Sequence, residues 1–320
     1  MKLAFSLALA GFGGFLALAA TTPTALAIDC LKATSSTEKA ICADPKAKAA
    51  DDAMVAAFST FKASLKPPQQ KVLVANQADW IATRDLCSQD ENGQEQTNQE
   101  KIAACVIRQS GDRQEFLLGQ PLEGPGLNDP LVPVIREGTD KSFFTSFDFA
   151  APATAGEKLF NATLDGEMKK YHLAKTADDY TDGFAVTLKY ASPELLSAYI
   201  EASDQSPTLA HPMDNTHNLN IDMRSGKILT IKDTFDKNAL ARLEDTCLSQ
   251  LKDYMANDSA TGDVAPELIR ADIESLATWS FGASEATLIF DQVDTDPSGV
   301  CRLPYADLRK VIKPGFPLPQ

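Results

Sequence analysis

The six cysteines are the residues whose type and spacing could do chemistry in this chain of 320 residues. A cysteine acts as a nucleophile only as a free thiolate near a base, and an even number of cysteines in an oxidising compartment instead favours disulfides. Four lie in one segment and two in another, which favours pairing within each segment. Of the pairings that the sequence allows, we predict Cys30–Cys42, Cys87–Cys105 and Cys247–Cys301.

Two other groups of residues are considered as metal ligands. His211 and His217 lie six positions apart, but a catalytic zinc site needs a tighter helical pair or a third close ligand. Residues 294–299 resemble the start of a calcium loop, but its twelfth position would be Tyr305 in place of a bidentate glutamate. We interpret the histidines as part of a loop entering a strand and the second stretch as a hairpin turn. The sequence therefore nominates no metal, no cofactor and no catalytic residue.

The N-terminus has the pattern of a signal peptide. Lys2 supplies a positive start, residues 3–20 are apolar, and small residues at Ala25 and Ala27 suit signal peptidase. We predict cleavage of residues 1–27 and a periplasmic or secreted protein without stable membrane insertion. The alternative is a retained membrane anchor.

The charge of the chain bears on its partners. Cleavage removes Lys2, the one charged residue of that segment, and takes the formal charge from −14 to −15. Such a field disfavours nucleic acid and anionic lipid and attracts a cationic partner. An acidic protein without such a partner would have the same charge, so the charge alone does not decide between them.

Helical patterns dominate residues 28–118. Asp44-Pro45 predicts a helix start, since a capping residue precedes proline in the first turn. Apolar residues then recur at helical spacing up to Pro67-Pro68. Two more helices are expected, over residues 69–86 and from Ile102 to Leu117, with a polar loop over residues 88–98.

Residues 119–140 contain eight Gly or Pro among 22 residues and predict a linker. Beyond it, alternating stretches predict strands and two longer periodic stretches predict helices. The expected strands are residues 142–150, 158–165, 184–191, 195–202, 217–223, 277–281, 286–290 and 299–303, and the expected helices are residues 238–256 and 266–277. The predicted fold class is multidomain, with an all-α disulfide-bonded helical domain (28–118) and an α+β C-terminal domain (141–320).

One element of the helical domain has a specific spacing, Gln77-x-x-Trp80-Ile81-x-x-Arg84-Asp85-x-Cys87. Together with Thr37–Cys42, Asp51-Asp52 and the pair Cys105 and Arg113, it makes residues 28–118 resemble the LprI-like family of secreted four-cysteine helical domains. The resemblance implies a non-enzymatic protein that inhibits c-type lysozyme.

The motif residues Gln77, Trp80, Arg84 and Asp85 allow two interpretations. Trp80 and Arg84 lie four apart and share a helix face, which could contact a partner. We favour a scaffold in which Trp80 packs in the core and Arg84 pairs with Asp51 or Asp52, because amphipathic helices usually bury their aromatic residue.

The polar loop supplies the candidates for partner binding. Lysozyme is basic, so acidic loop residues would complement it. We nominate Asp90, Glu91 and Glu95. The alternative is that this loop is a plain solvated connection.

The second domain resembles the lysozyme-binding ectodomain of the anti-sigma factor RsiV. The resemblance rests on Asn218-x-Asn220-x-Asp222 and on the stretch from Ser225 to Phe235. Residues 291–300 depart from that family, because they are acidic and lack its aromatic hairpin. From both resemblances we expect a protein that binds or inhibits a lysozyme. The alternatives are an envelope structural or assembly factor that binds another protein or peptidoglycan, and a cell-wall hydrolase.

Overall fold

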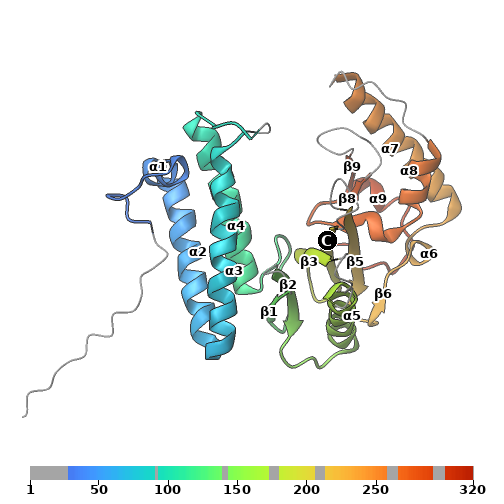
Figure 1. The fold of residues 1–320 in the computed structure, drawn as a ribbon. Helices are drawn as coiled ribbons and strands as arrows, with labels where there is room; N and C mark the ends of the chain where they lie inside the picture. Colours follow the sequence, from blue (N-terminus) through green and yellow to red (C-terminus); the bar gives the residue numbers. More distant parts are fainter. Residues whose placement is uncertain are drawn as a thin grey trace, which may run out of the picture.

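The structure is a computed structural model and describes residues 28–90, 93–138, 143–172, 180–205, 213–257, 266–290 and 300–319. A bundle of helices comes first in the chain and lies beside a mixed α+β part (Figure 1). This organisation confirms the predicted fold class. The predicted signal peptide lies outside the described residues. Among the described residues, no helix has the length and apolar character needed to cross a membrane.

The helical part consists of α1 (Ser36–Ala43), α2 (Pro45–Ser64), α3 (Pro67–Asp85) and α4 (Gln99–Leu118). The Asp44 carboxylate accepts hydrogen bonds from the backbone N–H groups of Lys46 and Ala47, which confirms the predicted start of α2. At the other end of the bundle, α4 stops at Gly119, whose φ of 65° is a left-handed C-cap.

Two apolar clusters and two disulfides hold the helices together. One cluster, around Ile41, Ile102 and Val106, lies near α1, and the other, around Met54 and Leu73, lies toward the far end of α2. The disulfides are Cys30–Cys42 and Cys87–Cys105, as predicted. The second disulfide joins α4 to the short 3₁₀ helix η1 (Leu86–Ser88) that follows α3.

A six-stranded sheet forms the centre of the α+β part. Its strands lie in chain order: β1 (Leu131–Glu137), β2 (Phe143–Phe149), β3 (Tyr180–Ala191), β4 (Leu195–Gln205), β5 (Met213–Asp222) and β6 (Lys227–Ile228). All neighbours are antiparallel except β2 and β3, which are parallel.

The parallel pair explains one wrong prediction. Residues 158–165 were expected to be a strand but lie within helix α5 (Ala155–His172). Parallel neighbours need a crossover, which is usually helical. Phe160, Leu164 and Met168 recur at helical spacing and are buried against the sheet, so tertiary packing selects the helix.

A second, three-stranded sheet completes the chain. It contains β7 (Trp279–Phe281), β8 (Glu285–Ile289) and β9 (Val300–Pro304). The surrounding helical elements are α6 (Ile231–Thr234), α7 (Lys237–Asn257), α8 (Pro266–Ile273), η2 (Leu276–Thr278) and α9 (Tyr305–Leu308). The disulfide Cys247–Cys301 joins α7 to β9, as predicted.

The segment 119–140, predicted to be a linker, is largely held by the sheet. Its residues 131–137 form β1 and pair with β2. Upstream, the Leu122 and Gly126 N–H groups donate to the Leu188 and Ala191 carbonyls, at 2.8 and 3.0 Å. The Gly and Pro content had suggested a flexible connection, but Leu131, Val132, Val134 and Ile135 supply a β-forming run within it. The division of the chain into independent domains here stays a prediction.

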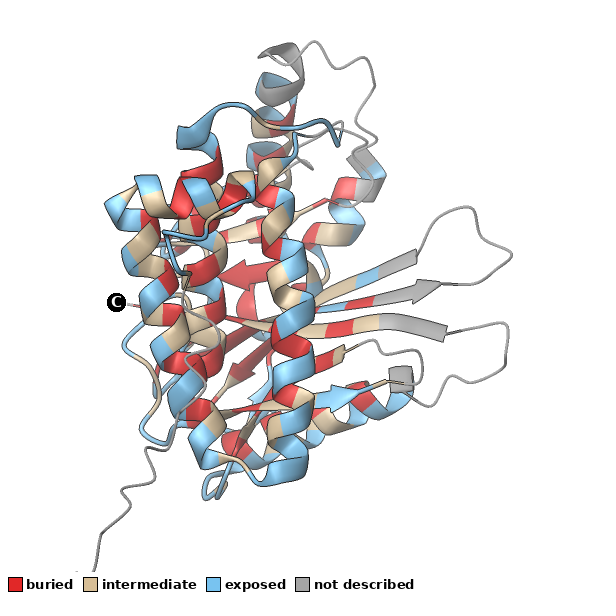
Figure 2. Ribbon diagram, turned by 60° about the vertical axis from the view of Figure 1, so that its left-hand side comes forward, coloured by how far each residue is buried: buried red, intermediate tan, exposed pale blue. Residues whose placement is uncertain are grey.

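The two parts share an apolar contact. Val132 and Ile135 of β1 pack against the cluster of the helical part that contains Met54. Phe116 of α4 meets Phe147 of β2 edge to face, with ring centres 5.2 Å apart. Buried residues accordingly run through the bundle and on into the sheet behind it (Figure 2). The bundle is therefore positioned against the sheet by side chains as well as by the connecting chain.

Candidate partner-binding site

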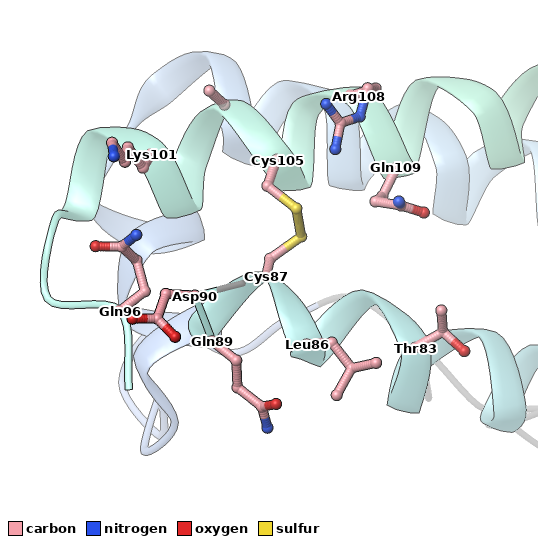
Figure 3. Close-up of a pocket in the computed structure, with 11 residues that line it drawn as sticks. Thr83, Leu86, Cys87, Gln89, Asp90, Gln96, Lys101, Cys105, Arg108 and Gln109 are labelled. Atoms are coloured by element: carbon pink, nitrogen blue, oxygen red, sulfur yellow. A yellow bond between two sulfur atoms is a disulfide. The ribbon is translucent and has the colours of Figure 1, made fainter. Parts of the chain in front are cut away.

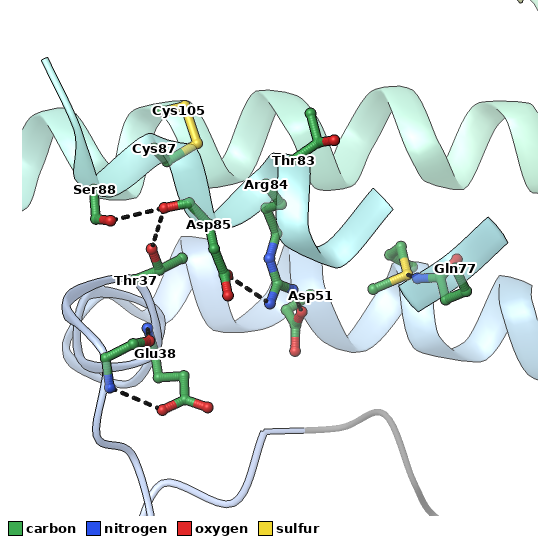
Figure 4. Close-up of polar contacts among 12 residues, drawn as sticks. Thr37, Glu38, Asp51, Gln77, Thr83, Arg84, Asp85, Cys87, Ser88 and Cys105 are labelled. Atoms are coloured by element: carbon green, nitrogen blue, oxygen red, sulfur yellow. Dashed lines mark hydrogen bonds and ion pairs between the residues drawn. A yellow bond between two sulfur atoms is a disulfide. The ribbon is translucent and has the colours of Figure 1, made fainter. Parts of the chain in front are cut away.

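The motif residue Arg84 ties α3 to α2. Its Nη1 lies 2.7 Å from Oδ1 of Asp51, and both side chains are buried (Figure 4). Burial raises the pKa of Asp51, and the positive charge of Arg84 opposes that shift. Asp85 lies 3.5 Å from the same guanidinium. The ion pair with Asp51 is the contact that the scaffold interpretation expected.

Trp80 and Gln77 belong to the same framework. The half-buried Trp80 ring lies 5.3 Å from the guanidinium carbon of Arg84 and 5.8 Å from that of Arg113. The Gln77 carbonyl oxygen accepts a hydrogen bond of 3.0 Å from Arg113 Nε. Burial lowers the pKa of Arg113 to about 10, and Asp79 opposes this. The motif thus connects α3 to α2 and α4.

The predicted polar loop is a small hairpin at one end of the bundle. Asp90 N–H donates to the Gln94 carbonyl at 2.8 Å, and Gln96 N–H donates to the Ser88 carbonyl at 2.7 Å. Glu95 accepts a hydrogen bond of 3.0 Å from the Ser36 hydroxyl. Asp90 and Glu95 are exposed, whereas Glu91 lies outside the described residues. The hairpin is therefore attached to α1 and displays carboxylates to solvent.

A depression of about 860 Å³ lies beside this hairpin (Figure 3). α4 forms one wall, the end of α3 with η1 forms the other, and the disulfide Cys87–Cys105 joins the two walls. Its lining includes charges of both signs, amides and apolar groups, among them Asp90, Gln96, Lys101, Arg108, Gln109 and Leu86. Leu86 is 54% exposed. An exposed apolar group with a polar rim is the usual composition of a protein-binding patch.

The sequence did not reveal this depression. Lys101 and Arg108 lie seven residues apart, hence on one face of a helix. That spacing was the one feature of the sequence that could have indicated a shared surface. Their proximity to Leu86 depends on how α4 packs on α3, which periodicity does not define. The end of the bundle that carries the nominated Asp90 and Glu95 therefore holds a larger candidate surface than the loop alone.

The arrangement of the described residues does not support either of the two metal sites considered from the sequence. His217 lies inside β5, where burial lowers its pKa. His211 and residues 294–299 lie outside the described residues. Within the part of the chain that the structure describes, no three His, Cys, Asp or Glu side chains come together as a metal ion would require.

Comparison with known proteins identifies the helical part. Residues 30–117 match the family model described as "Lysozyme inhibitor LprI", so this part of the chain is an LprI domain and the predicted resemblance is confirmed. No curated protein sequence matches the chain.

Two solved structures are similar to the chain. One is a DUF3298 family protein of Pseudomonas aeruginosa PAO1, with 13% identity, a TM-score of 0.41, and coverage of 63% of this chain and 99% of that one. The other is a DUF3298 family member of Bacteroides fragilis NCTC 9343, with 15% identity, a TM-score of 0.39, and coverage of 57% and 92%. A lysozyme-binding role for the α+β part stays a prediction.

Proposed function

We propose that this protein is an exported, non-enzymatic inhibitor or binder of a lysozyme-type muramidase. The observation that carries the proposal is the LprI domain at residues 30–117. The three disulfides suit the oxidising conditions outside the cytoplasm. The formal charge of −14 suits a cationic partner.

The proposed contact surface is the hairpin end of the bundle. Asp90 and Glu95 display carboxylates there, and the adjoining depression offers Leu86 as an apolar anchor. Acidic groups at the edge of an interface raise the association rate with a basic protein, and a central apolar side chain supplies binding free energy. The surface therefore combines both requirements at one end of the LprI domain.

The test is titration of the purified mature chain against c-type lysozyme, with lysis of cell walls as the activity readout. We expect slowed lysis, and binding that weakens as salt is raised, because exposed charges are screened. The double variant Asp90→Asn/Glu95→Gln should slow association, whereas Glu194→Gln, an exposed acid in the turn between β3 and β4, should not. A mature chain that neither binds lysozyme at low salt nor slows it would rule out the proposal.

A further inference from the structure

A second depression, of about 420 Å³, lies at the outer edge of the six-stranded sheet, beside β6 and α6 (Figure 1). We call it the edge trough. One wall is residues 228–232, which run from β6 into α6, and the other is residues 274–277, which run from the end of α8 into η2. Asn218 and Asn220 of β5 form its floor. The volume lies within the usual range for ligand sites, about 300–1,000 Å³.

The pairing of β5 leaves part of its outer edge open at this trough. β6 pairs with only the last two residues of β5, and the Leu229 N–H group adds one bond of 2.8 Å to the Asn220 carbonyl before the chain turns into α6. In an antiparallel pair, alternate residues direct their N–H and C=O groups to the same neighbour. Asn218, two residues before Asn220, therefore directs its backbone toward the trough. Among the described residues, no strand pairs with β5 at that position.

The other three sheet edges that the structure describes are blocked. At β7, the side chains of Ser197 and Asn220 bind the outward backbone groups, at 3.1 and 2.8 Å. At β9, the Gln250 amide donates to the Arg302 carbonyl at 2.8 Å and accepts from the Arg302 N–H at 2.9 Å. β1 contains Pro133, which has no N–H group, and packs against the bundle. Proteins block edges in these ways to prevent strand addition, so the open edge of β5 differs from the rest.

The side chain of Asn218 shows that a donor is missing in the trough. This residue is only 7% exposed. Its Nδ2 donates to the Ala277 carbonyl at 3.2 Å, which fixes the orientation of the amide, and its Oδ1 has no hydrogen-bond partner among the described residues. Buried polar atoms nearly always have a partner. Oδ1 therefore marks a position that requires an N–H or O–H donor from a guest.

The lining favours an uncharged guest with an extended backbone. Lys232 and Glu274 are the charged residues among those described in the lining, one on each wall, so that their charges cancel. Ile228, which is 45% exposed, adds an apolar surface beside β5. An extended peptide has a neutral backbone, alternates N–H and C=O groups along its edge, and directs every second side chain to one face. A glycan supplies hydroxyl groups without that alternation.

We propose that the edge trough receives an extended peptide segment of a partner protein, which adds to the six-stranded sheet alongside β5, beyond the end of β6. The segment pairs with the backbone of Asn218 and brings N–H groups to the side where Oδ1 lacks a donor. Ile228 contacts one of its side chains. This inference does not rest on the proposed function, because the site lies in the α+β part and recognises a backbone and not a particular protein.

Calorimetric titration of the full mature chain tests the proposal. The probe is a blocked hexapeptide of alternating valine and threonine, and the matched control is the same peptide methylated at every backbone nitrogen, which removes the N–H donors and keeps the side chains. We expect saturable binding of the first peptide and none of the second. Hydrogen exchange followed by nuclear magnetic resonance should show slower exchange of the Asn218 N–H group when the first peptide is bound.

Substitutions locate the binding at the trough. Ile228→Lys should weaken the hexapeptide by at least about ten-fold, because it removes an apolar contact and places a lysine on the edge, where it opposes pairing. Val74→Lys is the matched control, since Val74 is also 45% exposed but lies on α3, and should bind as the native chain does. Asn218→Ala should weaken binding by about two-fold to ten-fold, as for one lost hydrogen bond. If Asn218→Ala misfolds, the exposed position of Ile228 still provides a test.

Four results would overturn the proposal. They are absence of hexapeptide binding, equal binding of the methylated peptide, full binding by Ile228→Lys, and a saturable response to chitotriose in place of the peptide. Sedimentation of the chain alone covers a further occupant. A concentration-dependent dimer that Ile228→Lys abolishes and Val74→Lys retains would assign the edge to a second copy of the chain and overturn the proposal as well.

Discussion

The LprI domain and the α+β part stabilise their buried polar groups in different ways. In the LprI domain, one buried network contains charged groups: Arg84 pairs with Asp51, and Arg113 is held by amides. In the α+β part, Asn220 Nδ2 donates to the Leu276 and Trp279 carbonyls, at 2.9 and 2.8 Å. The Ser197 hydroxyl in turn donates to Asn220 Oδ1 at 2.7 Å.

This difference has an energetic consequence. A buried charge that loses its partner keeps the full penalty of its removal from water, whereas a neutral group that loses its partner keeps a smaller one. The LprI domain should therefore respond more strongly to substitution and to pH than the network around Asn220. Both networks use residues from sequence motifs, so in each part motif residues contribute to the buried framework.

The largest effect is expected for Arg84→Leu. This change leaves the Asp51 carboxylate buried without its cation, which typically costs about 3–5 kcal/mol. Urea unfolding of the mature chain, followed by circular dichroism, measures the loss in free energy of unfolding. Arg136→Gln is the matched control, because Arg136 is 42% exposed in a surface ion pair with Asp165 and should change stability by no more than about 1 kcal/mol. Equal losses in the two variants would contradict the role given to the buried pair.

A smaller effect is expected for Asn220→Ala. The change removes the donor for the carbonyls of Leu276 and Trp279 and the acceptor for Ser197. Buried groups left unsatisfied cost about 1–3 kcal/mol, so the loss should be below that of Arg84→Leu. Asn238→Ala, at an exposed position in α7, should stay within about 0.5 kcal/mol. A loss for Asn220→Ala as large as that for Arg84→Leu would remove the distinction between charged and neutral networks.

The sequence predicted the parts of the fold that local rules define. The helix start at Asp44-Pro45 follows from capping, and the grouping of the cysteines predicts Cys247–Cys301, whereas among the four N-terminal cysteines it leaves other pairings open. It failed where a distant partner decides the structure. Residues 158–165 have apolar residues that fit either period, and the parallel pair β2–β3 selects the helix. Strand β1 was obscured by the Gly and Pro around it, and its partner β2 holds it in the sheet.

The candidate site, like the fold, could be predicted from the sequence only in the parts that local rules define. The hairpin carboxylates of Asp90 and Glu95 could be nominated because polar loops are recognisable in sequence. The depression at Leu86 and the cleft between α3 and the six-stranded sheet could not be predicted, since the first forms only where two helices approach each other and the second only where a helix approaches a sheet. Trp80 and Thr216, for example, line one cleft although they lie 136 positions apart in the chain.

The smallest and most selective test of the comparison is the pH dependence of Arg84→Leu. In the native chain, burial already raises the pKa of Asp51 above its ordinary value of 3.8, and loss of the Arg84 charge raises it further. A carboxyl whose folded-state pKa lies above its unfolded-state pKa contributes stability below the unfolded value and loses it as pH rises through that window. The loss in free energy of unfolding that Arg84→Leu causes relative to the native chain should therefore shrink toward acid pH, by at most about 1.4 kcal/mol per pH unit.

Asn220→Ala changes no titratable group, so the deficit in free energy of unfolding that it causes should stay constant across the same pH range. Parallel unfolding curves between pH 4 and 7 measure both deficits, and a constant deficit for Arg84→Leu would show that Asp51 is not the group left without a partner.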